Sequence, residues 1–323
     1  MEDYFSRSEA LLGIETMEAL RTKRVILFGV GGVGSWCAEA LIRTGLTHLT
    51  IVDGDTVQPS NVNRQLPATR ETLGRPKVEV LKERLLTINP EAEIVAIHRM
   101  YNPTPKEFYD RPQDARSSGA LHPSREGEKE KAYDFRIEEY DYVIDAIDSV
   151  AAKTDLIINA TRAKGVKIFS SMGAALRFDP TRVTTGELMA IKGDALAKAV
   201  RARMKRMGLK PYRKVKCVYS MEQAMRLQST DRSADGVQTE QAVKGSLMQV
   251  TAVFGCTLAS MVIEDIREKV SIKNCQEETS LPKKGTGWRC ILVRGNSERG
   301  PENPERPDRY ANPGNRPCMV DAI

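Results

Sequence analysis

Four glycines stand where an apolar run meets a helical pattern: Gly29, Gly31, Gly32 and Gly34, in LFGVGGVGSW. Gly29, Gly31 and Gly34 form GxGxxG, in which glycines permit a tight turn and close approach of the backbone. The helix N-terminus that follows offers unpaired N–H groups to a phosphate. The pattern accepts any nucleotide, and tight strand-to-helix packing without a ligand would also produce it. By itself the loop predicts a nucleotide site and leaves the nucleotide open.

The residues after this loop narrow the choice of nucleotide. Asp53 ends the next predicted strand, where an acid can hydrogen-bond a ribose hydroxyl, and to this point a nicotinamide dinucleotide fits. A redox enzyme needs no further layer of polar side chains there, whereas a protein that cleaves a triphosphate does. This chain has such a layer, made of Asp55, Asn61, Asn63, Arg64, Gln65 and Lys77.

Two cations and two acids could carry the chemistry of triphosphate cleavage. Arg64 and Lys77 could neutralise charge that develops between the α- and β-phosphates. Asp145 and Asp148, in VIDAIDS at the end of a later strand, could hold the Mg²⁺ that such chemistry requires. Taken singly, the cations could be surface charges and the acids could cap a helix. Their order after one glycine loop favours an ATP site.

A basic segment follows later in the chain, at residues 198–216. It contains nine Lys or Arg residues and no acid, which is the composition expected of a surface that neutralises RNA phosphates. A solvated helix face is the alternative. Tyr212 and Tyr219 could stack on a base, although a packing role is the favoured interpretation. The basic residues are Lys198, Arg201, Arg203, Lys205, Arg206, Lys210, Arg213, Lys214 and Lys216.

The elements that must position these residues alternate between strand and helix patterns. We expect helices at 8–21, 35–45, 74–89 and 153–165, and buried strands at 24–30, 48–53, 93–97, 140–148 and 166–171. Such alternation predicts the α/β class, with a Rossmann-like, doubly wound, mostly parallel sheet and helices on both faces.

The chain has 323 residues, 41% hydrophobic, and a formal net charge of +6. We expect a catalytic domain over 1–270, interrupted by a polar insertion at about 102–134 and containing a basic region at about 195–220. Residues 275–323 have the composition of a disordered tail. The uncharged stretch 245–263 is barely long enough to span a membrane, so a buried core helix is the better interpretation and no integral membrane segment is expected.

Six cysteines without a CxxC pair provide no framework for a zinc site. Cys37 and Cys256 lie in apolar helical patterns, which predicts that both are buried. Together with the absence of a signal peptide, this favours a reducing, cytoplasmic location.

The constellation resembles the ThiF/MoeB/HesA group of adenylating enzymes, relatives of the ubiquitin-activating enzymes. The matching motifs are GVGGVGS at 29–35, DGDTVQPSNVNRQ at 53–65, GRPK at 74–77 and DAID at 145–148. The resemblance implies a homodimer that binds ATP and Mg²⁺ and adenylates a carboxylate with release of pyrophosphate. It also implies that Arg7, in YFSRSEALLG, reaches the nucleotide of the partner subunit.

Residues 169–188, FSSMGAALRFDPTRVTTGEL, resemble the strand and turn of the tRNA threonylcarbamoyladenosine dehydratases, as do GSW and VIDAIDSV. That resemblance implies that ATP activates the threonyl carboxylate of a modified adenosine beside the tRNA anticodon, and that the neighbouring carbamoyl group then closes a ring with net loss of water. Because the attacking group is tethered, no protein nucleophile is needed. Neither Cys217 nor Cys256 is expected to form a thioester. The family pattern after SSMGA often has a glycine where this chain has Ala175.

Three rival functions stay open on the sequence. They are activation of a ubiquitin-like sulfur-carrier protein, nicotinamide-dependent redox chemistry, and non-catalytic RNA binding. The missing CxxC pairs disfavour the first of these, and the polar layer around Arg64 disfavours the other two. A bound monovalent cation and a sulfur-transfer partner protein are also left open.

Overall fold

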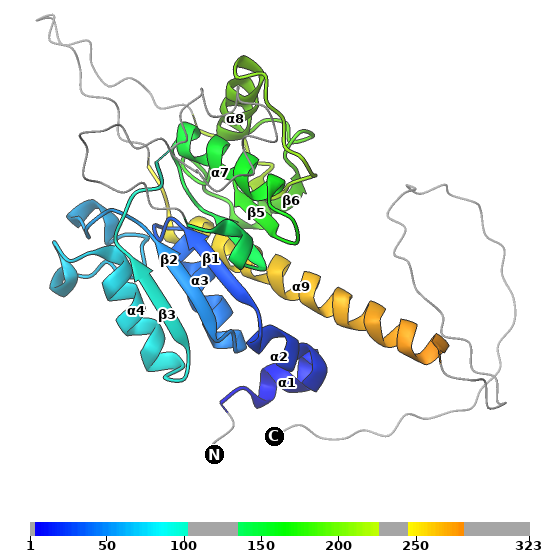
Figure 1. Cartoon of the computed structure of the whole chain (residues 1–323). Helices are drawn as coiled ribbons and strands as arrows, with labels where there is room; N and C mark the ends of the chain where they lie inside the picture. The colour runs from blue at the N-terminus through cyan, green and yellow to red at the C-terminus, as the bar shows by residue number, and fades with distance from the viewer. Residues whose placement is uncertain (1–3, 103–134, 226–244, 281–323) are drawn as a thin grey trace, which may run out of the picture. The chain divides into compact units, whose positions relative to one another are not determined.

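The computed structural model describes residues 4–102, 135–225 and 245–280, and within these ranges seven strands form one sheet (Figure 1). The strand order is β3-β2-β1-β4-β5-β7-β6, with β6 antiparallel to β7 and every other pair parallel. The strands are β1 (Arg24–Phe28), β2 (His48–Val52), β3 (Glu93–Ile97), β4 (Tyr142–Asp145), β5 (Lys167–Ser171), β6 (Val183–Glu187) and β7 (Lys216–Ser220).

Helices cover both faces of the sheet, as the sequence predicts. One core contains α2, α3, α4 and α9, and the opposite core contains α7 and α8. The helices are α1 (Ser6–Leu12), α2 (Ile14–Arg21), α3 (Gly34–Thr44), α4 (Lys77–Ile88), α7 (Val150–Arg162), α8 (Ala195–Arg206) and α9 (Met248–Ser280), with the 3₁₀ turns η1 (Pro59–Asn61), η2 (Arg70–Thr72), η3 (Ile137–Glu139) and η4 (Pro180–Arg182). The predicted α/β fold is therefore confirmed.

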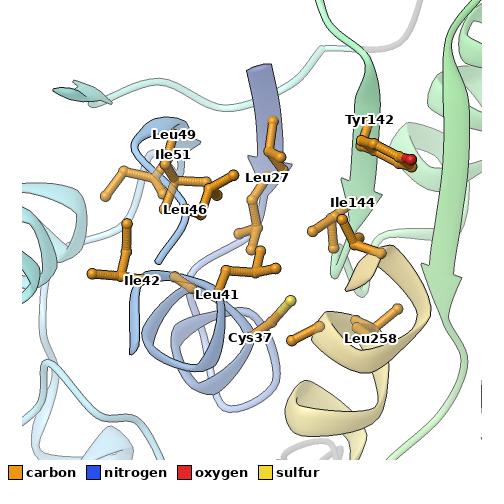
Figure 2. Packing of buried hydrophobic residues seen from close by; sticks show 14 of the residues in the cluster. Leu27, Cys37, Leu41, Ile42, Leu46, Leu49, Ile51, Tyr142, Ile144 and Leu258 are labelled. Atoms are coloured by element: carbon orange, nitrogen blue, oxygen red, sulfur yellow. The ribbon is translucent and has the colours of Figure 1, made fainter. Parts of the chain in front are cut away.

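The alternation of side chains along β1 explains how one strand serves two cores. Leu27 packs on α3 and α9, whereas its neighbours Ile26 and Phe28 belong to the opposite core. Figure 2 shows Leu27 with Cys37 and Leu41 of α3, and Leu258 of α9 on the same side. These side chains are fully buried, so the strand is fixed from both faces and its carboxyl end is held firmly.

The strand order reverses at β1, and this places the candidate site. From β1 the chain moves outward to β2 and β3, then returns to the other side of β1 with β4 and β5. In doubly wound sheets, ligands bind outside the carboxyl ends of the strands at such a switch point. Here that point lies between Phe28, at the end of β1, and Asp145, at the end of β4.

Two expected elements differ from the observed ones. The helix expected over 8–21 is two helices, because Gly13 adopts a φ of 82° between α1 and α2. Helix α9 continues to Ser280, so residues 275–280 are helical rather than the start of a tail. The predicted insertion (from residue 103), part of the 220–244 loop and the tail from 281 lie outside the described residues.

Helix α9 is long and apolar enough over Met248–Gln276 to cross a membrane, but half of its apolar stretch is buried inside the protein. Its buried residues Val250, Phe254, Leu258 and Val262 belong to the core around α3, as predicted for a core helix. At Gly255, an added Cβ would lie 2.4 Å from the Val33 carbonyl oxygen, so α9 approaches the start of α3 at backbone distance.

Candidate nucleotide site at the carboxyl edge of the sheet

The four glycines of the loop have different reasons to be glycine. A Cβ on Gly34 would lie 1.8 Å from the carbonyl oxygen of Gly29, and one on Gly29, whose φ is +86°, would lie 2.8 Å from the Ala146 oxygen. Packing alone therefore requires these two. Gly31 and Gly32 face side chains instead, those of Gln65 and Arg64. The second pair keeps the backbone open on the side where a ligand would approach.

Asp53 ties the glycine loop to the turn after β2. One carboxylate oxygen accepts the Val30 N–H at 2.8 Å and the other accepts the Asp55 N–H at 2.8 Å. Burial raises the pKa of Asp53, partly offset by the Asp55 N–H and by Lys77. Each carboxylate oxygen keeps a second lone pair, so a ribose contact for Asp53 stays a prediction.

Arg64 lies against the glycine loop, and hydrogen bonds hold both its backbone and its side chain. The Trp36 indole N–H donates to the Arg64 carbonyl oxygen at 3.1 Å, a contact that the sequence analysis did not anticipate. The Arg64 guanidinium donates to the carbonyl oxygen of Ser60 and to the side-chain oxygen of Asn63. It is partly exposed, so these hydrogen bonds can be exchanged for a phosphate.

Two more amides of the motif are buried. Asn61 accepts the Gln58 N–H and thereby shapes the turn η1, which is a structural duty. Gln65 is only 7% exposed, and its side-chain oxygen is buried without a hydrogen-bond partner among the described residues. An orphan acceptor next to Gly31 is costly unless a ligand or water supplies a donor.

Lys77 is placed by the first turn of α4 and directed by an acid. Its side chain is 5% exposed, and its ammonium donates to Asp55 at 2.7 Å. Asp55 is in turn bonded to Asp53 through its N–H. The pair joins α4 to the turn after β2, so Lys77 is oriented beside the glycine loop before any ligand arrives.

Asp145 does not have the expected place of a ligand-binding acid. It is completely buried and bonds Lys153 at 2.7 Å and Ser170 at 2.6 Å, and its other oxygen accepts the Ile147 N–H. Lys153 has no exposed surface either. Asp145 therefore supports the turn after β4 from beneath. The sequence signal that could have revealed this network is a lysine inside the apolar helix SVAAKTDLII.

Asp148, by contrast, is exposed at the carboxyl end of β4. Its turn packs on the glycine loop, because Ala146 lies against Gly29. Among the described residues no group of three or more His, Cys, Asp or Glu side chains could hold a metal ion. A single exposed carboxylate can bind Mg²⁺ only if phosphates and water supply the other ligands, and this is how the ion is held beside nucleotides.

A loop after β5 lies next to the nucleotide motifs. The Asn63 amide donates to the Ser246 carbonyl oxygen at 2.8 Å, and the preceding Gly245 oxygen accepts the Leu176 N–H at 2.9 Å. The loop is also pinned to α8, because Asp194 accepts from Arg177 and from the Gly173 N–H while capping α8. Residues 173–179 are thus held between the ATP motifs and the basic helix.

The structure divides the basic segment. Arg213 donates to the last carbonyl oxygens of α7, at Ala160, Thr161 and Ala163, and Arg201 donates to that of Leu188. These two arginines are used inside the fold, and Arg203 is partly buried. Arg213 is itself exposed, and the other exposed residues of the segment are Lys198, Lys205, Arg206, Lys210, Lys214 and Lys216.

The basic segment also runs away from the site. Helix α8 starts beside Gly173, at the carboxyl edge, whereas Arg213 contacts the end of α7 and Lys216 begins β7, which is parallel to β5. Twelve helical residues span about 18 Å. Lys198 is therefore near the carboxyl edge, and the residues from Lys205 to Lys216 approach the opposite edge.

Arg7 lies on α1, far from the glycine loop of its own chain. Phe5, just before α1, lies near Gly45 at the end of α3, and Arg21 of α2 bonds Thr47 just before β2. Both contacts are at the amino edge of the sheet, as Figure 1 shows for α1 and α2. Arg7 is exposed there.

Three described cysteines, Cys37, Cys217 and Cys256, show no activated thiol. Burial raises the pKa of Cys217 and of Cys37 well above the usual range. The prediction that Cys256 is buried was wrong: its side of α9 faces outward, and burial of part of the side chain still raises the pKa. Thiolates rather than thiols are nucleophiles, so these three cysteines offer none.

The ThiF family profile matches residues 5–290. The chain belongs to the ThiF family. A tRNA threonylcarbamoyladenosine dehydratase from Bacillus subtilis is 32% identical over 279 residues, covering 85% of this chain and 98% of the relative. The molybdopterin-synthase adenylyltransferase of Escherichia coli is 32% identical over 162 residues, which is only 50% of this chain and 53% of that protein.

Solved structures of tRNA N6-threonylcarbamoyladenosine dehydratase from E. coli have the same fold. The complex with ATP is 30% identical to this chain, has a TM-score of 0.64, and matches 83% of this chain and 96% of its own. The complex with AMP is 32% identical with the same TM-score, over 83% and 95% of the two chains.

Proposed function

We propose that this protein dehydrates N6-threonylcarbamoyladenosine in tRNA at the expense of ATP. The observation that supports the proposal is that the loop 173–179 is hydrogen-bonded through Gly245 and Ser246 to Asn63, next to Arg64 and the glycine loop. Full-length similarity to dehydratases supports it, whereas similarity to a sulfur-carrier-activating enzyme extends over half of the chain.

In the proposed reaction, a threonyl carboxylate oxygen attacks the α-phosphorus of ATP and pyrophosphate leaves. The carbamoyl group of the same side chain then attacks the acyl carbon, the ring closes, and AMP leaves with the carboxylate oxygen. The substrate loses one water, whose oxygen is found in AMP. A tethered attacking group supplies the proximity that a protein nucleophile would otherwise provide, in agreement with the protonated, buried thiol of Cys217.

The residues of the site divide this work. The open backbone at Gly31 and Gly32 admits the phosphates, and Arg64 and Lys77 stabilise the charge that grows as pyrophosphate leaves. Lys77 does so from a fixed position, because Asp55 holds its ammonium. Asp53, Asn63 and Gln65 shape the pocket around them.

Asp148 would hold Mg²⁺ against the nucleotide phosphates, since it is the exposed acid of the turn that packs on Gly29. The ion, when bound, would neutralise phosphate charge and orient the leaving group. Asp145 is excluded from this role by its burial against Lys153.

A homodimer is part of the proposal, because Arg7 cannot serve the glycine loop of its own chain. Around Arg7 the apolar side chains of Leu11 and Ile14 are 83% and 61% exposed, which suits a surface covered by a second copy. Arg7 would then reach the partner's nucleotide. The substrate's phosphates would contact the exposed basic residues along α8 and beyond, apart from Arg213, which is engaged by α7.

The test is mass spectrometry of nucleosides from tRNA that carries the modification, after incubation with the protein, ATP and Mg²⁺. We expect the modified nucleoside to lose one water only when ATP is present. Arg64→Ala should slow this loss about 100- to 1,000-fold, the usual effect of removing one electrostatic stabiliser. Arg70→Ala, an exposed arginine of the neighbouring turn η2, is the matched control and should keep wild-type activity.

The proposal fails if the tRNA mass does not change while ATP is cleaved only after a small protein ending in Gly-Gly is added. That result would establish the sulfur-carrier alternative instead.

A further inference from the structure

Phe178 is the most exposed aromatic ring near the candidate site. Its side chain is 67% exposed, although a phenyl ring usually gains by burial. Met225 and Met221, at 62% and 57%, are exposed on the segment that binds the same loop. The Met225 N–H donates to the Leu176 oxygen, and that of Met221 to the Arg182 oxygen. Three exposed apolar side chains are therefore carried by two hydrogen-bonded segments at the carboxyl edge.

The loop that carries Phe178 is held rigidly. Both carboxylate oxygens of Glu222 accept the Phe178 N–H, at 3.1 and 3.0 Å, and one of them also accepts the Asp179 N–H at 3.0 Å. Leu176 has a φ of 60°, the left-handed conformation that a branched residue rarely adopts. The fold thus accepts local strain and three specific hydrogen bonds while the ring at their centre stays in solvent.

The position of the ring relates it to the ATP motifs. Two hydrogen bonds connect the loop to the motif: the Leu176 N–H donates to the Gly245 carbonyl oxygen, and the Asn63 side-chain amide donates to the Ser246 carbonyl oxygen. Asn63 directly precedes Arg64. Residues 176–179 therefore lie beside the motif, where they can contact a substrate whose carboxylate reaches the nucleotide between Arg64 and the glycine loop.

The charges around Phe178 do not favour phosphate binding. Asp179 and Glu222 lie on the same loop cluster as Arg177 and Arg182, and Arg177 is buried in its ion pair with Asp194. The exposed lysines from Lys205 onward approach the other edge of the sheet. What the loop offers is an aromatic face, and unpaired bases bind aromatic faces by stacking without regard to their identity.

We propose that Phe178 is a stacking platform for an unpaired anticodon-loop base that neighbours the modified adenosine. The platform and the basic segment would then divide the recognition of tRNA: the ring orders one base beside the site, and the lysines at the far edge bind phosphates of the stem. This inference rests on the proposed dehydratase function.

The experiment is equilibrium binding of modified anticodon stem-loop RNA without ATP, measured by fluorescence anisotropy. Three RNAs are compared: the intact loop, and loops that lack the base on the 5′ or on the 3′ side of the modified adenosine. Phe178→Ala should raise the Kd for intact RNA roughly 5- to 140-fold, the range for losing one stacked base. Phe178→Trp should restore binding.

Comparing the effect of Phe178→Ala on the three RNAs distinguishes the loss of a stacked base from a general disturbance of the loop. For one of the two abasic RNAs, Phe178→Ala should change the Kd less than about twofold, because the base that it contacts is already missing. Tyr212→Ala is the matched control: this tyrosine is 48% exposed but follows the far end of α8, so its effect should be the same for all three RNAs.

Equal losses for all three RNAs on Phe178→Ala would overturn the inference, as would unchanged binding of the intact loop. Wild-type protein that dehydrates tRNA while Phe178→Ala binds normally would refute the stacking role of Phe178 and leave the proposed function standing. Failure of the wild-type protein to bind or dehydrate the modified RNA would instead refute the proposed function itself.

Discussion

The turn after β2 and the turn after β4 are built alike, and their difference is instructive. Each carries two aspartates, Asp53 and Asp55 in one and Asp145 and Asp148 in the other. In each, the first acid accepts backbone N–H groups of its own turn and the second is exposed. The first acid of each pair therefore shapes a loop that presents the second.

The two turns differ in how the inner charge is compensated. Asp145 is fully buried and faces the ammonium of Lys153, which is also fully buried. Asp53 is half-buried and faces two N–H groups, with the Lys77 ammonium engaged by Asp55. Full burial demands a whole opposite charge, whereas a half-buried carboxylate is tolerated with dipoles and a raised pKa.

The largest effect is expected at Lys153, whose charge compensates the buried carboxylate of Asp145. Lys153→Met should lower the free energy of unfolding by about 3–5 kcal/mol, because it leaves the Asp145 carboxylate buried without its counter-charge. Urea denaturation followed by circular dichroism measures this loss. Adding Asp145→Asn should recover at least half of it; a double variant no more stable than the single one would show that packing, not charge, is responsible.

The second-largest effect is expected at Asp148, the exposed acid of the turn after β4. Asp148→Asn should leave the unfolding free energy unchanged and raise the Mg²⁺ concentration for half-maximal activity by at least about 10- to 100-fold, the cost of weakening a metal site. A magnesium titration of the dehydration rate measures it. Glu138→Gln, an exposed acid in η3, is the control. A loss of stability without any change in Mg²⁺ dependence would show that Asp148 supports the fold, as Asp145 does, and does not bind the ion.

The smallest effect is a pH dependence at Asp53. Its pKa is raised by burial above the ordinary 3.8, so the folded state holds this proton more tightly than the unfolded state. Stability from this group is complete below its unfolded pKa and is lost as pH rises through the folded pKa. Wild type should therefore gain stability relative to Asp53→Asn as pH falls through that window.

Glu39 is the control for this pH prediction, because its pKa is shifted in the opposite direction. Burial acts to raise its pKa, but the guanidinium groups of Arg84 and Arg43 hold it below the usual value. Wild type should lose stability relative to Glu39→Gln as pH falls from about the ordinary 4.5 through the lowered pKa. Both pairs are measured by urea denaturation over a pH series, and curves that change in the same direction would contradict one of the two assignments.

Much of the fold could be predicted from the sequence because its signals are local. The apolar run of β1 and the glycines after it determine a strand, a tight turn and a helix without reference to the rest of the chain. The helix predicted over 8–21 failed because a helical pattern alone does not reveal that Gly13 takes a positive φ.

The duties of individual polar residues were decided by the tertiary structure. Arg213 and Lys214 are adjacent and equally basic in sequence, yet Arg213 is used by the carbonyl oxygens of α7, which is remote in the chain. Asp145 and Asp148 belong to one motif, yet only Asp145 faces Lys153. The sequence determined which chemical groups are present and in what order. The packing of distant elements decided which charges are buried against partners and which stay free for a ligand, because desolvation depends on what surrounds a group in space.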